Sequence, residues 1–183
     1  MARAKKPATT GDLIRSLLVI IIPLVIITLL FTNTPRDHPV KVVDWVPVLT
    51  TARTQAPFPV LAPTSVPAGW RATQVSWVKQ GQPGTSGQIS PRNQWELDFL
   101  DADDMFIGLS QGDGDTGDFV KQETRAGTAD GSSVIGGQTW DRVISPDERT
   151  RSLVRRDPAV TTVVSGDLGY AVLEAYAVSL APR

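Results

Sequence analysis

The chain has 183 residues, a formal net charge of −1 and no cysteine. That length suits one ordinary domain, and the near-neutral charge excludes a strongly basic nucleic-acid-binding protein. The absence of cysteine excludes disulfide bonds, a thiol nucleophile and zinc sites built from thiolates.

One long apolar run lies near the N-terminus. Residues 17–31 include one threonine, one proline and no charged side chain. The wider stretch 13–32 would make about 30 Å of helix, which is enough to cross a bilayer. Arg15 can extend its long side chain to the lipid headgroups, and transmembrane helices tolerate a proline such as Pro23. We therefore predict a single transmembrane helix over residues 13–32 that contacts the lipid bilayer.

The charges on either side of this run predict its orientation. Arg3, Lys5, Lys6 and Arg15 precede the core of the run, whereas the bases just beyond it are offset by acids. By the positive-inside rule, residues 1–12 form a short basic cytoplasmic tail. No small-x-small cleavage site follows the run, so an uncleaved signal anchor is favoured over a cleaved signal peptide. We expect a protein of the plasma membrane whose C-terminal domain is extracytoplasmic.

The remainder of the chain divides into a stalk and one domain. Residues 33–46 are polar and interrupted by proline, which is typical of a stalk. Residues 47–183 form the exported domain, in which alternating apolar and polar side chains predict strands. In chain order, the expected elements are a helix over 46–56, strands over 71–79, 94–101 and 105–111, a helix over 115–123, one hairpin of 133–135 with 138–144, another of 151–156 with 159–165, and a final helix over 168–180.

The strand over 94–101 has the clearest alternation. Trp95, Leu97 and Phe99 point to one side of it, and the acidic residues between them point to the other. Such half-polar strands are typical of an antiparallel sheet, because a parallel doubly wound sheet needs near-continuous apolar strands. We therefore predict an α+β domain with a mainly antiparallel sheet and helices packed on one face.

The final helix is predicted from a four-residue spacing. Leu168, Val172, Tyr176 and Leu180 would line one side of a helix that begins near Asp167, a suitable N-cap. The helix carries little charge, and isolated helices of this length are marginal in water. We therefore expect it to dock on the sheet through that row of side chains and to close the core.

The domain lacks the side chains of the common catalytic centres. His38, in the stalk, is the only histidine of the sequence. A Ser-His-Asp triad, a Cys-His pair and a histidine zinc site are therefore excluded from residues 47–183. A pair of carboxylates is the chemistry that remains. We predict a non-enzymatic domain with no catalytic residue, no cofactor and no metal ion.

One glycine-rich stretch invites a comparison with known ligand loops. Residues 112–117 match the G-x-G-x-x-G pattern of dinucleotide-binding loops, but Asp113, Asp115 and Asp118 would face the bound pyrophosphate. Asp113 and Asp115 also fit the first two ligand positions of a calcium loop, although position twelve is Thr124 instead of glutamate. We interpret the stretch as a strand-to-helix turn with a capping aspartate, with weak calcium binding as the alternative.

Tryptophan and arginine provide two further candidates. Trp77 and Trp95 are in phase with apolar strand neighbours, so we expect them in the core. Trp45, in the stalk, suits the membrane interface. A basic cluster in the second hairpin is interpreted as an exposed face, or alternatively as a contact for an anionic envelope polymer or lipid headgroups. The cluster consists of Arg149, Arg151, Arg155 and Arg156.

Several short segments follow the basic N-terminus and the apolar run in a characteristic order. They are Leu61-Ala62-Pro63, Val66-Pro67-Ala68-Gly69-Trp70, Trp95-Glu96-Leu97-Asp98-Phe99, Gly108-Leu109-Ser110-Gln111 before Asp113-Gly114, Trp140, Leu153-Val154-Arg155, and Val163-Val164-Ser165-Gly166. In these features the chain resembles the actinobacterial single-span membrane proteins grouped as domain of unknown function 4245. The resemblance covers essentially the whole chain and implies the topology and an actinobacterial source. It carries over no catalytic or binding residue.

Two hypotheses for the function follow from these observations. In the first, the domain is a non-catalytic module that binds a protein, lipid or polymer of the cell envelope, and no nucleic acid. In the second, it is a small carboxylate-dependent hydrolase that acts on an envelope component. The missing nucleophile–base pairs favour binding. An open apolar groove without clustered acids would support binding, and two carboxyls about 5–10 Å apart across a cleft would support hydrolysis.

Overall fold

The computed structural model describes two stretches of the chain, residues 10–31 and 40–182. They belong to two compact units, Met1–Pro39 and Val40–Arg183. Most of the predicted basic tail and the first part of the predicted stalk lie outside the described residues.

The first unit contains one helix, α1 (Thr10–Phe31), in its described part. This helix includes nearly all of the predicted span 13–32. Within the described ranges, no helix has both the length and the apolar character that are needed to cross a membrane. The transmembrane span therefore stays a prediction.

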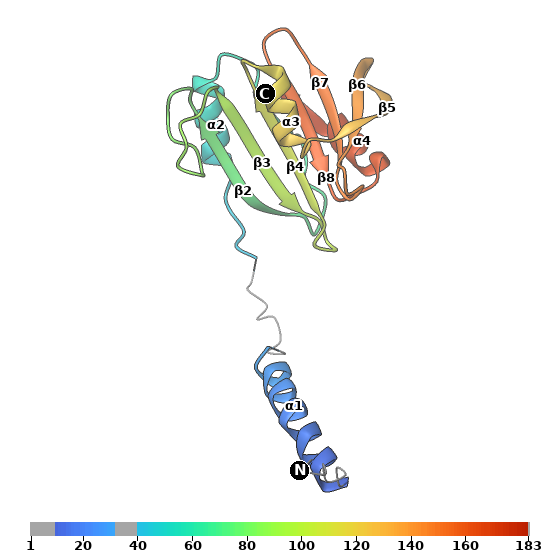
Figure 1. Cartoon of the computed structure of the whole chain (residues 1–183). Helices are drawn as coiled ribbons and strands as arrows, with labels where there is room; N and C mark the ends of the chain where they lie inside the picture. The colour runs from blue at the N-terminus through green and yellow to red at the C-terminus, as the bar shows by residue number, and fades with distance from the viewer. Residues whose placement is uncertain (1–9, 32–39, 183) are drawn as a thin grey trace, which may run out of the picture. The chain divides into compact units, whose positions relative to one another are not determined.

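The second unit combines helices with two sheets (Figure 1). Its elements are α2 (Val46–Gln55), β1 (Leu61–Pro63), β2 (Arg71–Val78), β3 (Gln94–Leu100), β4 (Phe106–Gly112), α3 (Thr116–Glu123), β5 (Thr128–Ile135), β6 (Gln138–Ile144), β7 (Arg151–Arg156), β8 (Thr161–Gly166), α4 (Tyr170–Ser179) and β9 (Leu180–Pro182). Seven strands form an antiparallel sheet in the order β2-β3-β4-β8-β7-β6-β5, and β1 pairs with β9. An α+β fold with a mainly antiparallel sheet is therefore confirmed.

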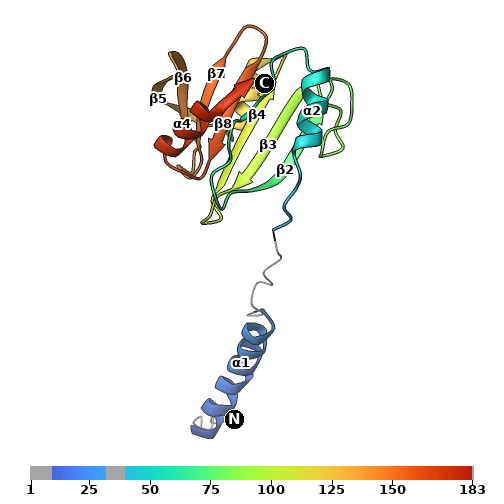
Figure 2. The same cartoon turned by 180° about the vertical axis from the view of Figure 1, so that it is seen from behind.

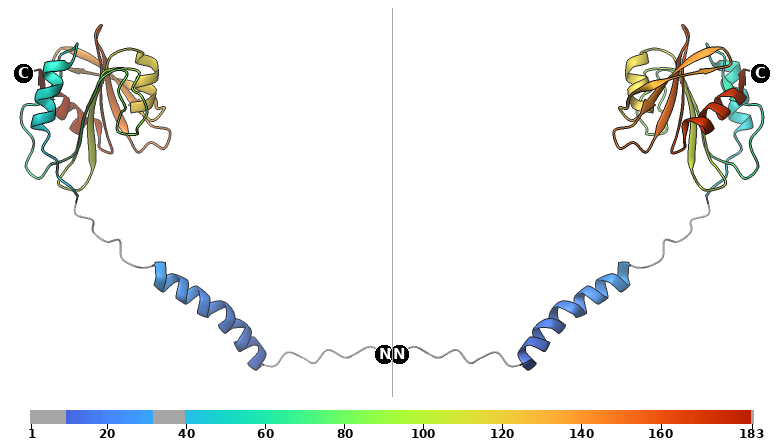
Figure 3. Two further views of the ribbon diagram at one scale, coloured as in Figure 1. Left: turned by 90° about the vertical axis from the view of Figure 1, so that its left-hand side faces the viewer. Right: turned by 90° about the vertical axis from the view of Figure 1, so that its right-hand side faces the viewer.

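Helices cover both faces of the seven-stranded sheet. Side views place α2 and α4 on one side of the sheet and α3 on the other (Figure 3), and α2 and α4 come to the front in the view from behind (Figure 2). The prediction of helices on one face is therefore wrong. The reason is that Val143, Val154 and Val163 form a second apolar patch, on which Phe119 of α3 packs. We call the two sides of the sheet the α4 face and the α3 face.

The larger core lies on the α4 face. Trp95, Leu97 and Phe99 of β3 are buried there, which confirms the predicted alternation. The ring of Tyr176 from α4 lies edge-on to Phe99, with 6.3 Å between the ring centroids. The Trp95 Nε1–H group donates to the Leu61 carbonyl oxygen at 3.0 Å, so β1 is tied to the same core.

The C-terminal helix is rotated and shifted relative to its prediction. It buries Leu173, Tyr176 and Ala177, while Val172, a member of the predicted row, is 39% exposed. Asp167 does not cap the helix, because its carboxylate accepts from Thr150 Oγ1 at 2.7 Å and also pairs with Arg149. The helix therefore starts after Gly169, without a side-chain cap.

Two sheet elements differ from the sequence prediction. β5 begins five residues before the predicted strand 133–135, and it contains a bulge between Ala129 and Ser132 and mostly exposed side chains. Such a strand shows little alternation for sequence analysis to detect. Likewise, the predicted final helix ends at Leu180, but Leu180 is the first residue of β9, which pairs with β1 far away in the sequence.

Candidate functional site

Polar side chains gather on the α3 face, where β2, β3 and β4 lie side by side. Strand pairing places Gln74 opposite Asp98, and Glu96 opposite Ser110. The small helix α3 packs against β4 and β8, so it leaves the surface over β2 and β3 uncovered by a helix. The alternation that builds the core on one face thus exposes a polar floor on the other.

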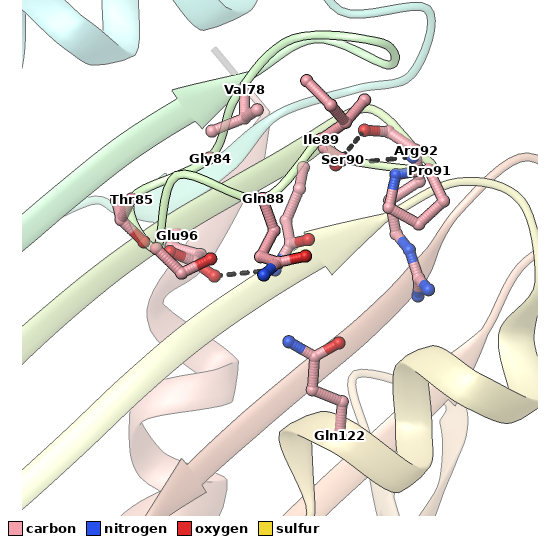
Figure 4. Close-up of a pocket in the computed structure, with 12 residues that line it drawn as sticks. Val78, Gly84, Thr85, Gln88, Ile89, Ser90, Pro91, Arg92, Glu96 and Gln122 are labelled. Carbon is pink, nitrogen blue, oxygen red and sulfur yellow. Dashed lines mark hydrogen bonds between the residues drawn. The ribbon is translucent and has the colours of Figure 1, made fainter.

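Two adjoining cavities above this floor form what we call the polar cleft. The first, of about 240 Å³, lies against the loop that connects β2 and β3. In Figure 4, Arg92 of that loop and Gln122 of α3 extend into it from opposite sides. The second, of about 200 Å³, lies over β3 and β4 and includes Asp98 and Glu123 in its lining. Glu96 and Gln122 line both cavities, so the two cavities adjoin.

Three carboxylates converge in the cleft. Glu96 accepts from Ser76 Oγ at 2.8 Å, and Glu123 accepts from Ser110 Oγ at 2.7 Å. The Gln94 Nε2 amide donates to both carboxylates, at 2.6 Å to Glu96 and 3.3 Å to Glu123. The two carboxyls therefore lie within reach of one ligand.

Asp98 is the carboxyl of the cleft whose pKa departs furthest from its ordinary value. Burial, followed by repulsion from Glu96 and Glu123, raises the pKa of Asp98 to about 7. Burial also raises the pKa of Glu123, against the opposing effect of its hydrogen bond from Ser110. Near neutral pH the cleft therefore contains a carboxyl that readily gains or loses a proton.

Glycine at the position opposite Asp98 gives its carboxyl room. A Cβ atom at Gly108 would lie 2.6 Å from Asp98 Oδ1 and 2.8 Å from Phe106 Cζ. Both distances are below any normal contact. Gly108 therefore leaves the space that the Asp98 carboxyl occupies between β3 and β4.

Arg92 is a buried cation at the other end of the cleft. Its side chain is only 6% exposed, and its guanidinium lies 5.1 Å from the centre of the Phe119 ring. Its Nη1 donates to the Asp115 carbonyl oxygen at 3.4 Å, and within the described residues it forms no ion pair. Much of its hydrogen-bonding capacity is therefore left for the cavity that it lines.

A second hollow lies on the α4 face. This apolar groove has a volume of about 560 Å³ and runs between α4 and the connector that leads into β2. Trp70 and Tyr176 form its aromatic wall, with 5.7 Å between their ring centroids. Charged residues are absent from its lining, which consists of Ser65, Pro67, Trp70, Ala171, Val172, Ala175, Tyr176 and Ser179.

The pattern of one protein family, described as "Protein of unknown function (DUF4245)", matches residues 5–180. The chain belongs to the DUF4245 family. The match spans both units, so it includes the polar cleft and the apolar groove of the DUF4245 domain, although the description of the family assigns chemistry to neither.

Comparison with other proteins adds little to this assignment. No curated protein matches the DUF4245 chain. Similar solved chains come from the complex structure of Pseudomonas aeruginosa MucA/MucB and from the crystal structure of MucB in complex with MucA(peri). Both have 12% sequence identity and a TM-score of 0.38, and the alignments cover 67% of this chain and 35% and 36% of theirs. The chain thus spans about a third of the length of those chains.

The glycine-rich stretch of the DUF4245 domain is the strand-to-helix turn that the sequence indicated. The Asp115 carboxylate caps α3 by accepting from the backbone N–H groups of Gly117 and Asp118, at 2.8 and 3.2 Å. The Asp113 carboxylate accepts from the backbone N–H and the side-chain amide of Asn93, at 2.8 and 2.7 Å. These carboxylates therefore have structural partners. Across the described part of the chain, no group of three or more acidic or histidine side chains is arranged to hold a metal ion.

The four arginines of the predicted basic cluster have partners within the domain. Arg149, Arg155 and Arg156 each pair with an aspartate, respectively Asp167, Asp157 and Asp141. Arg155 also lies 4.9 Å from the centre of the Trp140 ring, and Arg151 lies 6.0 Å from that of Tyr170. These contacts favour a structural role for the cluster over binding of an anionic polymer.

Three tryptophans also have defined places. Trp95 is fully buried, as predicted, whereas Trp77 is partly buried and donates its Nε1–H to Gln55 Oε1 at 3.0 Å. Trp45 packs edge-on to Phe99 of the core, with 6.3 Å between ring centroids. This contact places Trp45 in the folded domain, so the prediction that it lies in the stalk at the membrane interface is wrong.

Sequence analysis did not select the residues that build the cleft. Arg92 lies in a loop, and Glu123 lies at the end of a short helix, so no periodicity marks either of them. The available signal was the strand itself: Glu96 and Asp98 alternate with core residues on β3, and Gly108 stands in the next strand. Acids on the open side of a strand, with glycine on its neighbour, indicate a floor with room for a ligand.

Proposed function

We propose that the folded domain is a non-catalytic binding module, held at the outer side of the plasma membrane by residues 13–32. The apolar run of α1 supports the anchor, since it presents apolar side chains on the described part of that helix: Val19 is 73% exposed and Ile20 is 65% exposed. Insertion into a bilayer would remove this apolar surface from water. The basic residues before the run support a cytoplasmic N-terminus.

The polar cleft is the observation that carries the binding proposal. It combines two adjoining hollows with convergent carboxylate, amide, hydroxyl and guanidinium groups, which is the composition of a ligand site. Residues 40–183 contain neither histidine nor cysteine, so the common nucleophile–base pairs are missing beside it. Binding needs only the groups that are present.

Carboxylate-dependent hydrolysis is the second candidate, and Asp98 favours it. A carboxyl with a pKa of about 7 can donate a proton near neutral pH, as a general acid must. Glu96, which faces the same cavity, would then have to act as the partner carboxylate. This mechanism predicts that both side chains are essential for turnover.

Proximity labelling in the native host tests the binding proposal. The labelling enzyme is fused after Arg183 of the full chain, and Gln122→Lys is compared with Gln138→Lys. Both glutamines are exposed, but only Gln122 lines the cleft. We expect the Gln122 variant alone to lose labelled envelope partners. If both variants label the same partners as the parent chain, the cleft is not the binding surface.

Two further measurements test the anchor and the alternative. A reporter that works only outside the cytoplasm should be active when it is fused after Arg183, and a mature chain that starts near Pro35 would contradict the anchor. The full chain should release no soluble fragment from an envelope preparation. If the full chain does release soluble fragments, and if Asp98→Asn and Glu96→Gln each abolish that release, the domain is a hydrolase and the binding proposal is wrong.

A further inference from the structure

We infer that the polar cleft binds a carbohydrate, a ligand that is uncharged and rich in hydroxyl groups. This inference rests on the proposal that the cleft is the binding surface of the domain. It follows from four features of the cleft: the geometry of its polar groups, their free hydrogen-bonding capacity, their charge balance and an adjoining apolar rim.

Planar polar groups dominate the first cavity. Gln88, Gln94 and Gln122 each present a carbonyl oxygen and an amide nitrogen in one plane, and Glu96 presents two oxygens. A sugar hydroxyl both donates and accepts, so neighbouring hydroxyls on a ring can satisfy the two atoms of one planar group. A ligand with only donors or only acceptors would leave half of these atoms unpaired.

Most of this capacity is unused within the domain. Among the described residues, the side-chain amides of Gln88 and Gln122 form no hydrogen bond with protein groups, and the hydroxyls of Thr85 and Ser86 form none either. Gln94 donates only through its nitrogen, to Glu96 and Glu123, and this leaves its carbonyl oxygen available. These groups surround one cavity, so one ligand can use them together.

The charges of the cleft disfavour a strongly charged ligand. Glu96, Asp98 and Glu123 would repel an anion, and Asp98 is only partly ionised near neutral pH. Arg92 and Arg125, which line the two ends, would repel a polycation. The two signs nearly balance, so a neutral polar ligand encounters no net opposing field.

An apolar rim beside these groups suits the carbon face of a sugar ring. Val78, Ile89 and Pro91 line the same cavity, and Ile89 is 64% exposed. The loop that carries this rim is held by backbone hydrogen bonds, including Gly81 N to Ser90 O and Ser90 N to Gln82 O, both 2.8 Å. The wall is therefore formed before a ligand binds, which lowers the entropic cost of binding.

The test uses the full chain in mild detergent and an array of neutral and acidic oligosaccharides. Neutral probes include oligomers of glucose, mannose, galactose, arabinose and N-acetylglucosamine, and acidic probes include oligomers of galacturonic acid. The strongest neutral hit is then titrated by calorimetry. We expect Gln88→Ala and Gln122→Ala each to weaken binding by about fivefold to tenfold, and Gln138→Ala, an exposed glutamine outside the cleft, to leave it unchanged.

Each outcome bears on a different part of the inference. Unchanged unfolding midpoints in the two cleft variants establish that lost binding is local. If no neutral oligosaccharide binds at about 10 mM, or if only acidic ones bind, the carbohydrate inference is overturned. Cleft-dependent proximity labelling would then still support the binding module. Equal binding by all three glutamine variants would overturn the inference by placing the sugar elsewhere.

Discussion

The two faces of the seven-stranded sheet are made by the same strands and have opposite properties. On β3, Trp95 and Leu97 lie in a core that α2 and α4 cover, while Glu96 and Asp98 on the α3 face border an open cleft. Among the described residues, one face is covered by two helices and the β1–β9 pair, and the other by one short helix, α3, beside the loop that connects β2 and β3. The comparison teaches that incomplete cover creates the site, because the carboxyls are partly removed from water without being given enough partners.

Removing the cover of the α4 face should have the largest effect. A chain that ends at Asp167 lacks α4 and β9, including the buried residues Leu173 and Tyr176. We expect the folded domain to lose cooperative unfolding, which circular dichroism during urea titration measures. Near-full stability of this truncated chain would show that α4 is an appendage, and the apolar groove would then be a surface feature that the core does not need.

A single core residue on the α4 face should come next. Leu97 is fully buried at the centre of β3, so Leu97→Ala is expected to lower the free energy of unfolding by about 2–5 kcal/mol. Glu96→Ala, on the same strand but facing the cleft, is the matched control and should cost less than about 1 kcal/mol. A loss below about 1 kcal/mol for Leu97→Ala would contradict the observed register.

Filling the floor of the cleft should have an intermediate effect. The methyl group of Gly108→Ala would collide with Asp98 Oδ1 and Phe106, at a cost of about 1–3 kcal/mol. The double variant Gly108→Ala with Asp98→Ala removes one of the two collisions, so we expect it to recover part of the loss. A double-mutant cycle of unfolding free energies measures this coupling, and simple additivity would argue against the close approach of the two residues.

The smallest expected effect is a pH dependence of stability that comes from Asp98 on the α3 face. The pKa of Asp98 is raised from 3.8 to about 7 in the folded chain, so folding favours its protonated form. The stabilisation that Asp98 adds to the folded state is therefore full below about pH 4. It decreases as the pH rises from there through 7, and it does not change further above that pH. We expect a loss of about 1–3 kcal/mol across that window, since partial exposure lets water screen the charge.

Asp98→Asn should flatten this slope, because the amide does not titrate. Urea unfolding at pH 5 and pH 8 measures the difference between the two proteins. Asp103→Asn, an exposed residue of a turn, is the control and should keep the slope of the parent chain. An unaltered slope in Asp98→Asn would mean that other groups, such as Glu123, determine the pH dependence.

Local patterns predicted those features that depend on neighbours in the sequence. The alternation of Trp95, Leu97 and Phe99 sufficed to place β3, and Asp115 was recognisable as the cap of α3. The buried side of α4 was missed because the prediction started the helix at Asp167. In the structure the Asp167 carboxylate accepts from Thr150, and the helix begins after Gly169. Thr150 lies in the loop before β7, outside the helix and its flanking residues, so no local pattern contains that contact.

The cleft could not be predicted for the same reason. Gln94 joins Glu96 to Glu123 only because α3 folds back over the sheet, and Arg92 is buried only because Phe119 lies beneath its guanidinium. Each of these residues is ordinary by itself in a sequence. Their chemistry comes from tertiary contacts that bring a loop, a strand and a helix to one place.

The pairing of β1 with β9 sets an order of events during synthesis of the chain. Leu61 pairs with Pro182, and β4, which is made early, pairs with β8 near the other end of the domain. Contacts of such long sequence separation form slowly and require both partners. The growing chain can form the β2–β3–β4 meander early, but the seven-stranded sheet stays incomplete until β8 has left the ribosome, and the β1–β9 pair can form only after that.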